Sequence, residues 1–243
     1  MKNVLVYLHP FKCFDRETTV LARIQIDNSI DLGWLPEDIM LITNFPYEYN
    51  GIKSIVIDDN QFCIVSPEST KTVIIPHLFE LGLIQPREIY WVHDFDACQL
   101  HPFNEASLNL RKDLGLTTYG YSSKWCFGSF FFNDQSCEIF QKIKNTMYQI
   151  DTDDERALRH LTKTGLVSES RYQTLNITYN FGMRHVAHNY GLADKPLKVL
   201  HFHPNHPKKG LRPLRIFMYG ENELLIPLMD DRLIKLFQDH GVK

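Results

Sequence analysis

Two carboxylates separated by one residue, Asp94 and Asp96, follow an apolar stretch of the chain. That stretch, residues 88–93 (Glu-Ile-Tyr-Trp-Val-His), predicts a buried strand, and residues i and i+2 of a strand point to the same side. Two carboxylates on one side can bind a hard cation such as Mg²⁺ or Mn²⁺, which usually completes its shell with substrate phosphates. In open α/β sheets the ligand crevice lies at the carboxyl ends of the strands. The pair therefore predicts a metal site, with a loop-capping pair as the alternative.

A second acidic group, Asp153-Asp154-Glu155, stands directly before Arg156-Ala157-Leu158. One interpretation is ordinary capping, because carboxylates in the first turn suit the positive end of a helix dipole. The other is a carboxylate held at a helix start, where it orients or deprotonates an attacking hydroxyl.

Histidines gather late in the chain, where His201 and His203 lie on one face of a predicted strand. Their spacing matches no standard zinc signature and no cysteine accompanies them. As a distant partner of Asp94 and Asp96, His201 can supply the nitrogen ligand that Mn²⁺ tolerates. The following Lys208-Lys209-Gly210 and Arg212 form either a solvated turn or a clamp for phosphate charge.

The elements that must position these side chains follow from the apolar pattern. Up to residue 93 the order is strand, helix, strand, strand, helix, strand, which indicates an α/β sheet with mainly parallel strands. The strands are expected at 4–8, 38–43, 54–57 and 88–93, and the helices at 17–32 and 66–81. Further strands are expected at 117–121, 128–132, 175–181 and 197–202, and further helices at 133–147, 151–161 and 231–240. The chain contains no repeat and no clear linker, which favours a single domain.

Composition excludes several classes of protein. The 243 residues include 26 Lys and Arg against 29 Asp and Glu, a net charge of −3, which argues against a nucleic-acid binder. With 44% hydrophobic and 23% charged residues, the chain is neither disordered, collagenous nor a coiled coil. Its unusual share is aromatic: 11 His, 11 Tyr and 16 Phe.

The cysteines and the first residues bear on the compartment. Five cysteines, an odd number without a C-x-x-C pair, suggest reduced thiols. The apolar run at residues 4–8 is too short for a signal peptide, and no run reaches the roughly 18 apolar residues of a membrane span. We therefore expect a cytoplasmic protein without a membrane anchor.

Taken in order, these parts resemble the nucleotide-sugar-dependent glycosyltransferases of the GT-A fold, over residues 4 to about 209. No single motif is specific, but the ordered series is. The series comprises the strand 4–8, the D-x-D at 94–96, Gly128-Ser129-Phe130-Phe131-Phe132, Asp154-Glu155-x-Ala157-Leu158, Tyr179-Asn180, and Leu200-His201-Phe202 followed by lysines. The resemblance implies a single α/β domain with a GT-A-like (Rossmann-like) mixed, mainly parallel sheet flanked by helices. Within it, residues 1–97 would form the nucleotide-sugar-binding half, 98–210 the acceptor-binding half and 211–243 a C-terminal extension.

The resemblance also implies roles for individual residues. Asp94, Asp96 and His201 would hold Mn²⁺ or Mg²⁺, with Asp94 also at the donor diphosphate. In an inverting enzyme Asp154 or Asp153 would be the general base, whereas a retaining enzyme needs none. The family's short Lys-Pro-Trp clamp is absent, because His203-Pro204-Asn205-His206-Pro207 follows the late histidine. The base and ribose of the donor would contact polar residues at the first strands, namely His9, Thr43, Asp58 and Lys71. An aromatic wall for the acceptor would comprise Tyr119, Tyr121, Trp125 and Phe127.

The expected activity is metal-dependent transfer of a sugar from a nucleoside-diphosphate donor to a hydroxyl of a glycan acceptor. One alternative is a metal-dependent nucleotidyltransferase or phosphohydrolase, although the sequence lacks the phosphate-binding G-x-x-x-x-G-K-[ST]. Another alternative is a non-catalytic carbohydrate-binding protein. The sugar, the stereochemical outcome and the oligomeric state stay open.

Overall fold

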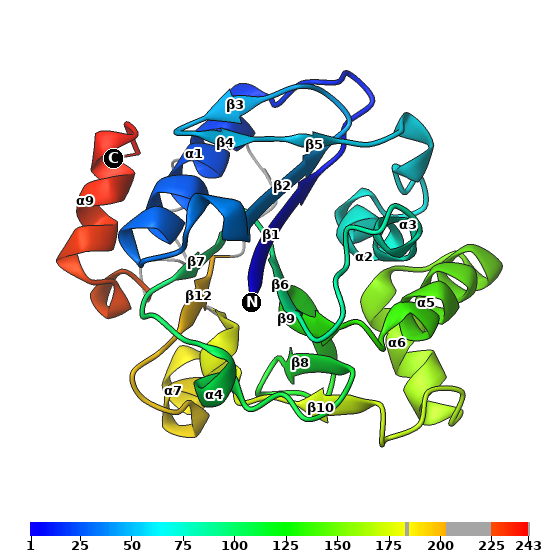
Figure 1. Cartoon of the computed structure of the whole chain (residues 1–243). Coiled ribbons are helices and arrows are strands. Elements are labelled where there is room, and N and C mark those ends of the chain that lie inside the picture. Colours follow the sequence, from blue (N-terminus) through cyan, green and yellow to red (C-terminus); the bar gives the residue numbers. More distant parts are fainter. Residues whose placement is uncertain (183–184, 203–224, 243) are drawn as a thin grey trace, which may run out of the picture.

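Four short apolar runs from the first part of the chain lie side by side as parallel strands (Figure 1). A computed structural model describes residues 1–182, 185–202 and 225–242. The parallel strands are β1 (Lys2–Tyr7), β2 (Ile39–Thr43), β5 (Ile55–Val56) and β6 (Ile89–His93). Their carboxyl ends share one edge of the sheet, which places the loops after β1, β2 and β6 next to one another.

Antiparallel pairing extends this sheet on the other side of β6. Strand β9 (Trp125–Asn133) runs antiparallel to both β6 and β8 (Leu114–Thr118), and β10 (Tyr172–Thr174) runs parallel to β8. The seven-stranded order is β10-β8-β9-β6-β1-β2-β5. The prediction of a mixed, mainly parallel sheet in a single domain is confirmed.

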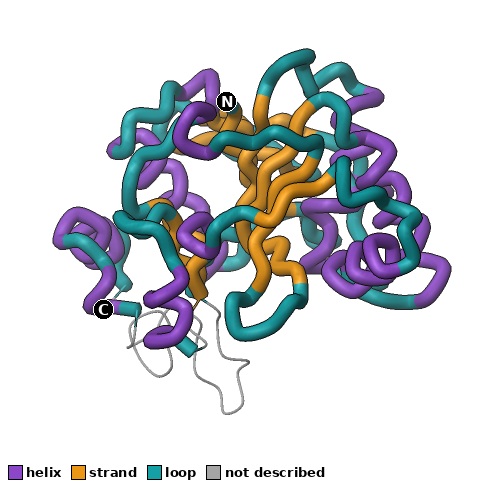
Figure 2. The backbone as a smooth tube through the Cα atoms, turned by 90° about the horizontal axis from the view of Figure 1, so that it is seen from below, coloured by secondary structure: helices purple, strands orange, loops and turns teal. Residues whose placement is uncertain are grey.

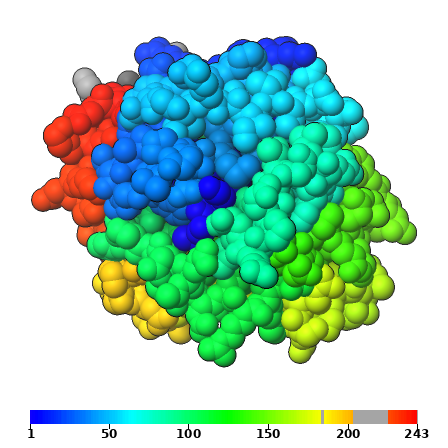
Figure 3. All heavy atoms as spheres, viewed as in Figure 1, coloured from blue at the N-terminus to red at the C-terminus, as the bar shows by residue number. Residues whose placement is uncertain are grey.

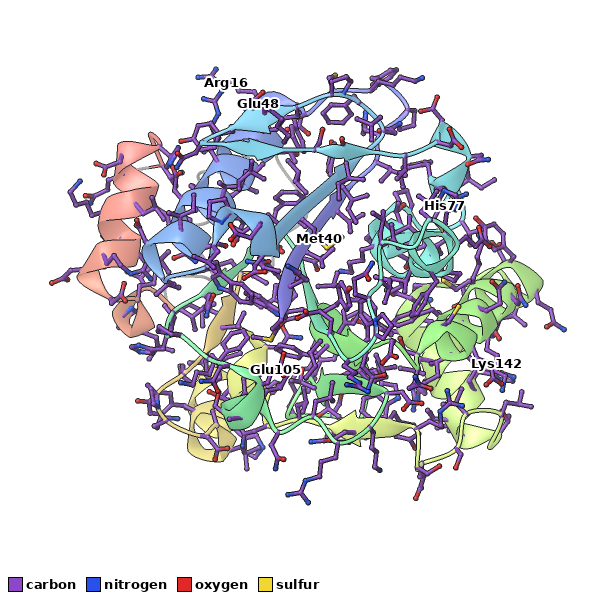
Figure 4. All side chains as sticks on the ribbon, viewed as in Figure 1. Arg16, Met40, Glu48, His77, Glu105 and Lys142 are labelled. Carbon is purple, nitrogen blue, oxygen red and sulfur yellow. The ribbon has the colours of Figure 1, made fainter. Side chains whose placement is uncertain are left out.

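Helices cover both faces of the sheet, as Figures 1 and 2 show. On one side lie α1 (Arg16–Asp31) and α9 (Asp231–Asp239). On the other lie α2 (Thr70–Val73), α3 (Ile75–Glu80), α5 (Cys137–Ile150) and α6 (Asp154–Lys163). In Figure 4, Met40 of β2 lies at the centre, whereas His77 of α3 and Lys142 of α5 lie on the helical layer, where they pair with Glu80 and Glu138. Because both faces are covered, the parallel strands are continuous apolar runs.

A second, three-stranded sheet brings the late part of the chain to the residues that follow β6. Its strands are β7 (Ala97–Gln99), β11 (Phe181–Gly182) and β12 (Val199–His201). Strand β12 lies in the middle, antiparallel to β7 and parallel to β11. This pairing places His201 opposite Ala97, directly after the D-x-D tripeptide.

The remaining elements are short. A hairpin of β3 (Glu48–Tyr49) and β4 (Ile52–Lys53) lies beyond β2. The others are η1 (Pro36–Asp38), η2 (Asp59–Gln61), η3 (Pro67–Ser69), α4 (Glu105–Leu108), η4 (Ile177–Tyr179), α7 (Val186–Leu192) and η6 (Ile226–Leu228). Figure 3 shows the surface from the side of Figure 1, with the N-terminal segments (blue to cyan) in the upper part and the segments from the middle of the chain (green) below them.

Three expected elements differ from the structure. The helix expected over 66–81 is divided into η3, α2 and α3, because Pro76 lies in the first turn of α3 and cannot continue a helix. The strand expected at 117–121 ends earlier as β8, since Tyr119 to Lys124 form the turn into β9, with Gly120 at φ +74°. The strand expected at 175–181 is instead a short helix, η4, before the two-residue β11.

The core accounts for most of the aromatic excess. Tyr90, Trp91 and the run Phe130 to Phe132 are fully buried where β6 and β9 pair. All five cysteines lie in the described part of the chain and are free, as predicted. Among the described residues, no helix has the length and apolarity to cross a membrane.

Candidate active site

The D-x-D tripeptide lies in a tight turn at the carboxyl end of β6. The amide of Asp94 donates to the carbonyl of Gly128 on β9 at 2.9 Å, and the amide of Ala97 donates to the carbonyl of Asp94 at 3.0 Å. Buried His93 places Nδ1 3.1 Å from the Asp94 carbonyl and 3.0 Å from that of Ala97. The turn is therefore fixed from several sides, and this favours one orientation of the two carboxylates.

The predicted grouping of Asp94, Asp96 and His201 occurs in the structure. Nε2 of His201 lies 3.4 Å from Oδ1 of Asp96 and 3.7 Å from Oδ2 of Asp94. One ligand atom from each residue lies within 4.8 Å of the others. Two carboxylates and one imidazole form a largely oxygen donor set, which suits Mn²⁺ or Mg²⁺.

A glycine on β9 makes room for the histidine. A Cβ atom on Gly128 would lie 1.9 Å from Cε1 of His201, so the imidazole packs directly against the backbone there. The amide of Phe202 donates to the carbonyl of Asp96 at 2.8 Å, which ties β12 to the turn. Gly128 was not predicted as a site residue, although a glycine inside a strand can signal such a close approach.

Lys71 is buried behind the metal candidates and forms an ion pair with Asp94. Burial lowers the pKa of Lys71, but the charges of Asp94 and Asp154 outweigh burial and raise it above its usual value. Conversely, burial raises the pKa of Asp94, and the Lys71 ammonium opposes that shift. For His201, burial acts to lower the pKa, but the Asp96 carboxylate raises it well above its usual value. The opposite charges of Lys71 and Asp94 therefore partly offset the cost of burying each group.

The acidic group at the start of α6 divides into a cap and two inward-facing carboxylates. Asp153 caps the helix, because its Oδ1 accepts from the amide of Arg156 at 2.8 Å. Asp154 is buried and accepts from the hydroxyl of Thr72 at 3.0 Å, next to Lys71. Burial raises the pKa of Asp154 to about 6.

Glu155, which was not predicted as a site residue, is also held inside the protein. Its carboxylate accepts from the hydroxyl of Tyr119 at 2.9 and 3.1 Å and from the amide of Phe127 at 3.3 Å. Burial, together with the charge of Asp154, raises the pKa of Glu155 to about 7. Its sequence position beside Asp154 gave no sign of these contacts, because they come from β9 and from the turn that precedes it.

Of the four residues predicted for the base and ribose, His9, Thr43 and Asp58 lie at the ends of β1, β2 and β5, whereas Lys71 lies in α2 and pairs with Asp94. The amide of His9 donates to Oδ1 of Asn44 at 3.0 Å, and Nδ2 of Asn44 donates to Asp59 at 3.0 Å. Thr43 is fully buried and its hydroxyl donates to the carbonyl of Phe45, whereas the side chain of Asp58 is exposed. The structure thus joins His9 to Asn44 and Asp59, two residues that the sequence did not single out.

The predicted aromatic wall is partly wrong. Trp125 and Phe127 are 8% and 1% exposed and belong to the main core, because β9 crosses the centre of a sheet that is covered on both faces. Tyr119 and Tyr121 are more accessible and line a small pocket in the turn between β8 and β9. The predicted basic loop of Lys208, Lys209 and Arg212, together with His203, lies outside the described residues.

Comparisons with known proteins give a likeness in structure but not in sequence. No protein-family model matches the chain, and no curated protein matches it. Among solved structures, a galactosyltransferase, LgtC, in complex with donor and acceptor sugar analogues matches 98% of this chain and 96% of its own, with a TM-score of 0.57 and 12% identity. The fold is that of the GT-A glycosyltransferases.

Two further structures with the GT-A fold are similar. A glycosyltransferase involved in the glycosylation of the major capsid of PBCV-1 has a TM-score of 0.55 at 10% identity, over 92% of this chain and 98% of its own. The glycosyltransferase GlyE of Streptococcus pneumoniae TIGR4 has a TM-score of 0.57 at 11% identity, over 100% of this chain and 65% of its own. The present chain therefore spans slightly less than two thirds of GlyE.

Proposed function

We propose that this protein is a metal-dependent glycosyltransferase. It transfers a sugar from a nucleoside-diphosphate donor to a hydroxyl of a glycan acceptor. The observation that carries the proposal is the group of Asp94, Asp96 and His201, whose ligand atoms lie within 4.8 Å of one another at the carboxyl edge of the sheet. In open α/β folds this edge is where ligands bind.

The chain's own residues prepare the site for a cation and a diphosphate. Asp94, Asp96 and His201 would hold Mn²⁺ or Mg²⁺, and the bound cation would neutralise charge that develops on the departing diphosphate. The Lys71 ammonium pairs with Asp94 and opposes the rise that burial causes in the pKa of its carboxyl. His9, with Asn44 and Asp59, offers polar groups to the base and ribose of the donor, as Asp58 does from the following loop.

The acceptor hydroxyl would approach from the side of α6. If the reaction inverts configuration, Asp154 is the better candidate for the general base, because its pKa of about 6 lies near neutral pH. The Asp153 carboxylate is already engaged as the cap of α6. Glu155 adds a second, partly buried carboxylate on this side of the site.

The test is an assay of nucleoside-diphosphate release from nucleotide sugars, with Mn²⁺ and glycan acceptors present. We expect Asp94→Asn, Asp96→Asn and His201→Gln each to reduce transfer about 100-fold or more, by analogy with the loss of a charge-stabilising group. Asp113→Asn is the matched control, because Asp113 pairs with Arg171 at the outer end of β8. If all three variants kept wild-type transfer and metal dependence, the metal assignment would be wrong.

The same assay distinguishes the alternatives by their products. A nucleotidyltransferase would release pyrophosphate and a phosphohydrolase inorganic phosphate, in place of a nucleoside diphosphate. A non-catalytic carbohydrate-binding protein would bind a glycan without metal or nucleotide and release none of these products.

A further inference from the structure

A small pocket lies where the turn between β8 and β9 meets β11. Its lining includes Tyr119, Tyr121, Cys126, Asn180, Gly182 and Asn189. Gly182 pairs with His201 across β11 and β12, and the hydroxyl of Tyr119 binds Glu155. The volume of about 10 Å³ is enough for one water-sized group, such as a single hydroxyl.

One side chain in this pocket has an unused acceptor. Asn180 is 4% exposed, and its Nδ2 donates to the carbonyl of Cys126 at 3.5 Å. Its Oδ1 is buried and accepts no hydrogen bond in the described part of the chain. The amide orientation follows from Cys126, because the reversed amide would place two acceptor oxygens against each other. A buried acceptor without a donor opposes folding, so the site is suited to a donor from a ligand.

The surroundings of Asn180 select the kind of donor. Neither a charged base nor a carboxylate is among the described residues that line the pocket, so the expected donor is neutral. Tyr121 is 36% exposed, with its ring centroid 4.6 Å from that of His185 and 6.0 Å from that of Tyr119. Such aromatic surfaces suit the apolar C–H faces of a sugar ring.

We propose that this pocket binds one hydroxyl of a neutral sugar, which donates a hydrogen bond to Oδ1 of Asn180 while the sugar ring lies against Tyr121. The inference deepens and rests on the proposed transferase function, which needs a sugar between the metal and α6. The same chemistry is present in the transferred sugar and in the acceptor, and the experiment below separates these two sources.

The first measurement needs no nucleotide. Saturation-transfer NMR with methyl glucosides, galactosides and mannosides at millimolar concentration should show contact with the wild-type protein. The signal should be lost in Asn180→Leu, which has a similar volume without the acceptor. Thr117→Val is the matched control and should keep the signal. The hydroxyl of Thr117 is also buried and accepts or donates no hydrogen bond in the described part of the chain, but Thr117 does not line the pocket.

Tyr121→Ala provides a second variant at an accessible position, in case Asn180→Leu fails to fold. It should weaken the signal without changing the thermal midpoint. Equal signals in the wild type and both pocket variants, or no signal in the wild type, would overturn the proposal.

The second measurement separates the two sources. Calorimetry with Mn²⁺ compares binding of UDP and GDP with binding of their glucose, galactose and mannose conjugates. If the pocket holds the transferred sugar, Asn180→Leu weakens the conjugates about tenfold, the value of one hydrogen bond, and leaves the bare nucleotides unchanged. If the pocket holds the acceptor, Asn180→Leu leaves both calorimetric affinities unchanged and raises only the KM for the acceptor in the transfer assay. Failure of the wild type to bind any nucleotide would contradict the proposed function, whereas the NMR result still decides the pocket.

Discussion

At the residue scale, the site depends on a glycine, Gly128, that packs against His201. Gly128 leaves the space that the imidazole of His201 occupies, since a Cβ there would lie 1.9 Å from Cε1. The buried ring is tied by its strand to Asp96, so it has little freedom to move aside. The position of His201, the proposed nitrogen ligand, therefore depends on a residue that has no side chain to offer a metal.

Gly128→Ala should displace His201 and lower the affinity for Mn²⁺ about 10- to 100-fold, the usual effect of disturbing the support of a metal ligand. Titration with Mn²⁺ followed by electron paramagnetic resonance measures this affinity. Gly191→Ala in α7 is the control, because beyond its chain neighbours and its own helix backbone nothing lies within 4 Å of its Cβ position. It should bind Mn²⁺ normally and gain about 0.5–1 kcal/mol in stability.

The double variant Gly128→Ala, His201→Ala addresses possible misfolding of the single one. Without the imidazole ring, the methyl group added at position 128 has room, so the stability should return to that of His201→Ala while the Mn²⁺ affinity stays low. Wild-type affinity in Gly128→Ala would show that His201 is not a ligand.

Glu155 offers a pH-dependent prediction, because its folded pKa of about 7 lies above its ordinary value of 4.5. The fold favours the protonated acid, so its contribution to stability is fully present below the ordinary pKa and is lost as the pH rises through about 7. The wild type should lose this contribution as the pH rises, whereas Glu155→Gln cannot. The difference in the free energy of unfolding between the variant and the wild type should therefore change by about 1–3 kcal/mol in favour of the variant from acidic to mildly alkaline pH.

Urea unfolding at a series of pH values measures this difference. Exposed Glu169→Gln should show a nearly constant difference from the wild type over the same range. A constant difference for Glu155→Gln as well would mean that Glu155 is not held in a desolvated environment.

At the scale of elements, neighbouring residues at the start of α6 have different roles: one caps the helix and two face into the protein. Asp153 accepts from the amide of Arg156, whereas Asp154 and Glu155 point into the protein. The sequence D-D-E indicates only that acids begin a helix. Which acid caps it and which face inward depends on the contacts of α6 with α2 and β9, and the local pattern does not contain them.

Asp153→Ala should therefore lower stability by about 1 kcal/mol, the usual cost of a lost helix cap, and leave the rate of transfer close to that of the wild type. Asp153→Ser, which can still cap, should restore the stability. Thermal unfolding and the transfer assay measure the two effects. A loss of transfer in a folded, stable Asp153→Ser protein would instead give Asp153 a part in the reaction.

Elements with a strong apolar pattern in the sequence were predicted well, and elements that depend on distant pairing were not. The strands at 4–8, 38–43 and 88–93 were predicted nearly to their ends, because buried parallel strands are short continuous apolar runs. The D-x-D position and its grouping with His201 followed from strand periodicity and the family resemblance. The two-residue β11 and the three-residue β7 were missed, since their pairing with β12 depends on residues far apart in sequence.

At the scale of the whole molecule, the two sheets meet where the D-x-D turn leaves β6 and enters β7. Strand β12, from the late part of the chain, pairs with β7, so the metal candidates come from segments more than 100 residues apart in the sequence. The site is thus complete only when both sheets have formed. The net charge of −3 is compatible with diphosphate binding, because a bound cation supplies positive charge that the chain lacks.

The proposed function requires that this site bind a nucleotide sugar through a divalent cation. Its most direct test is thermal unfolding with UDP, GDP, dTDP and CMP sugars, each with and without Mn²⁺. A ligand at 100 times its Kd adds about 2.7 kcal/mol, which corresponds to a rise of several degrees in a protein of this size. We expect one nucleotide class to raise the midpoint only with Mn²⁺, in the wild type and Asp113→Asn but not in Asp94→Asn/Asp96→Asn. A rise that persists without Mn²⁺ or in the double variant, or no rise for any nucleotide sugar, would contradict the account.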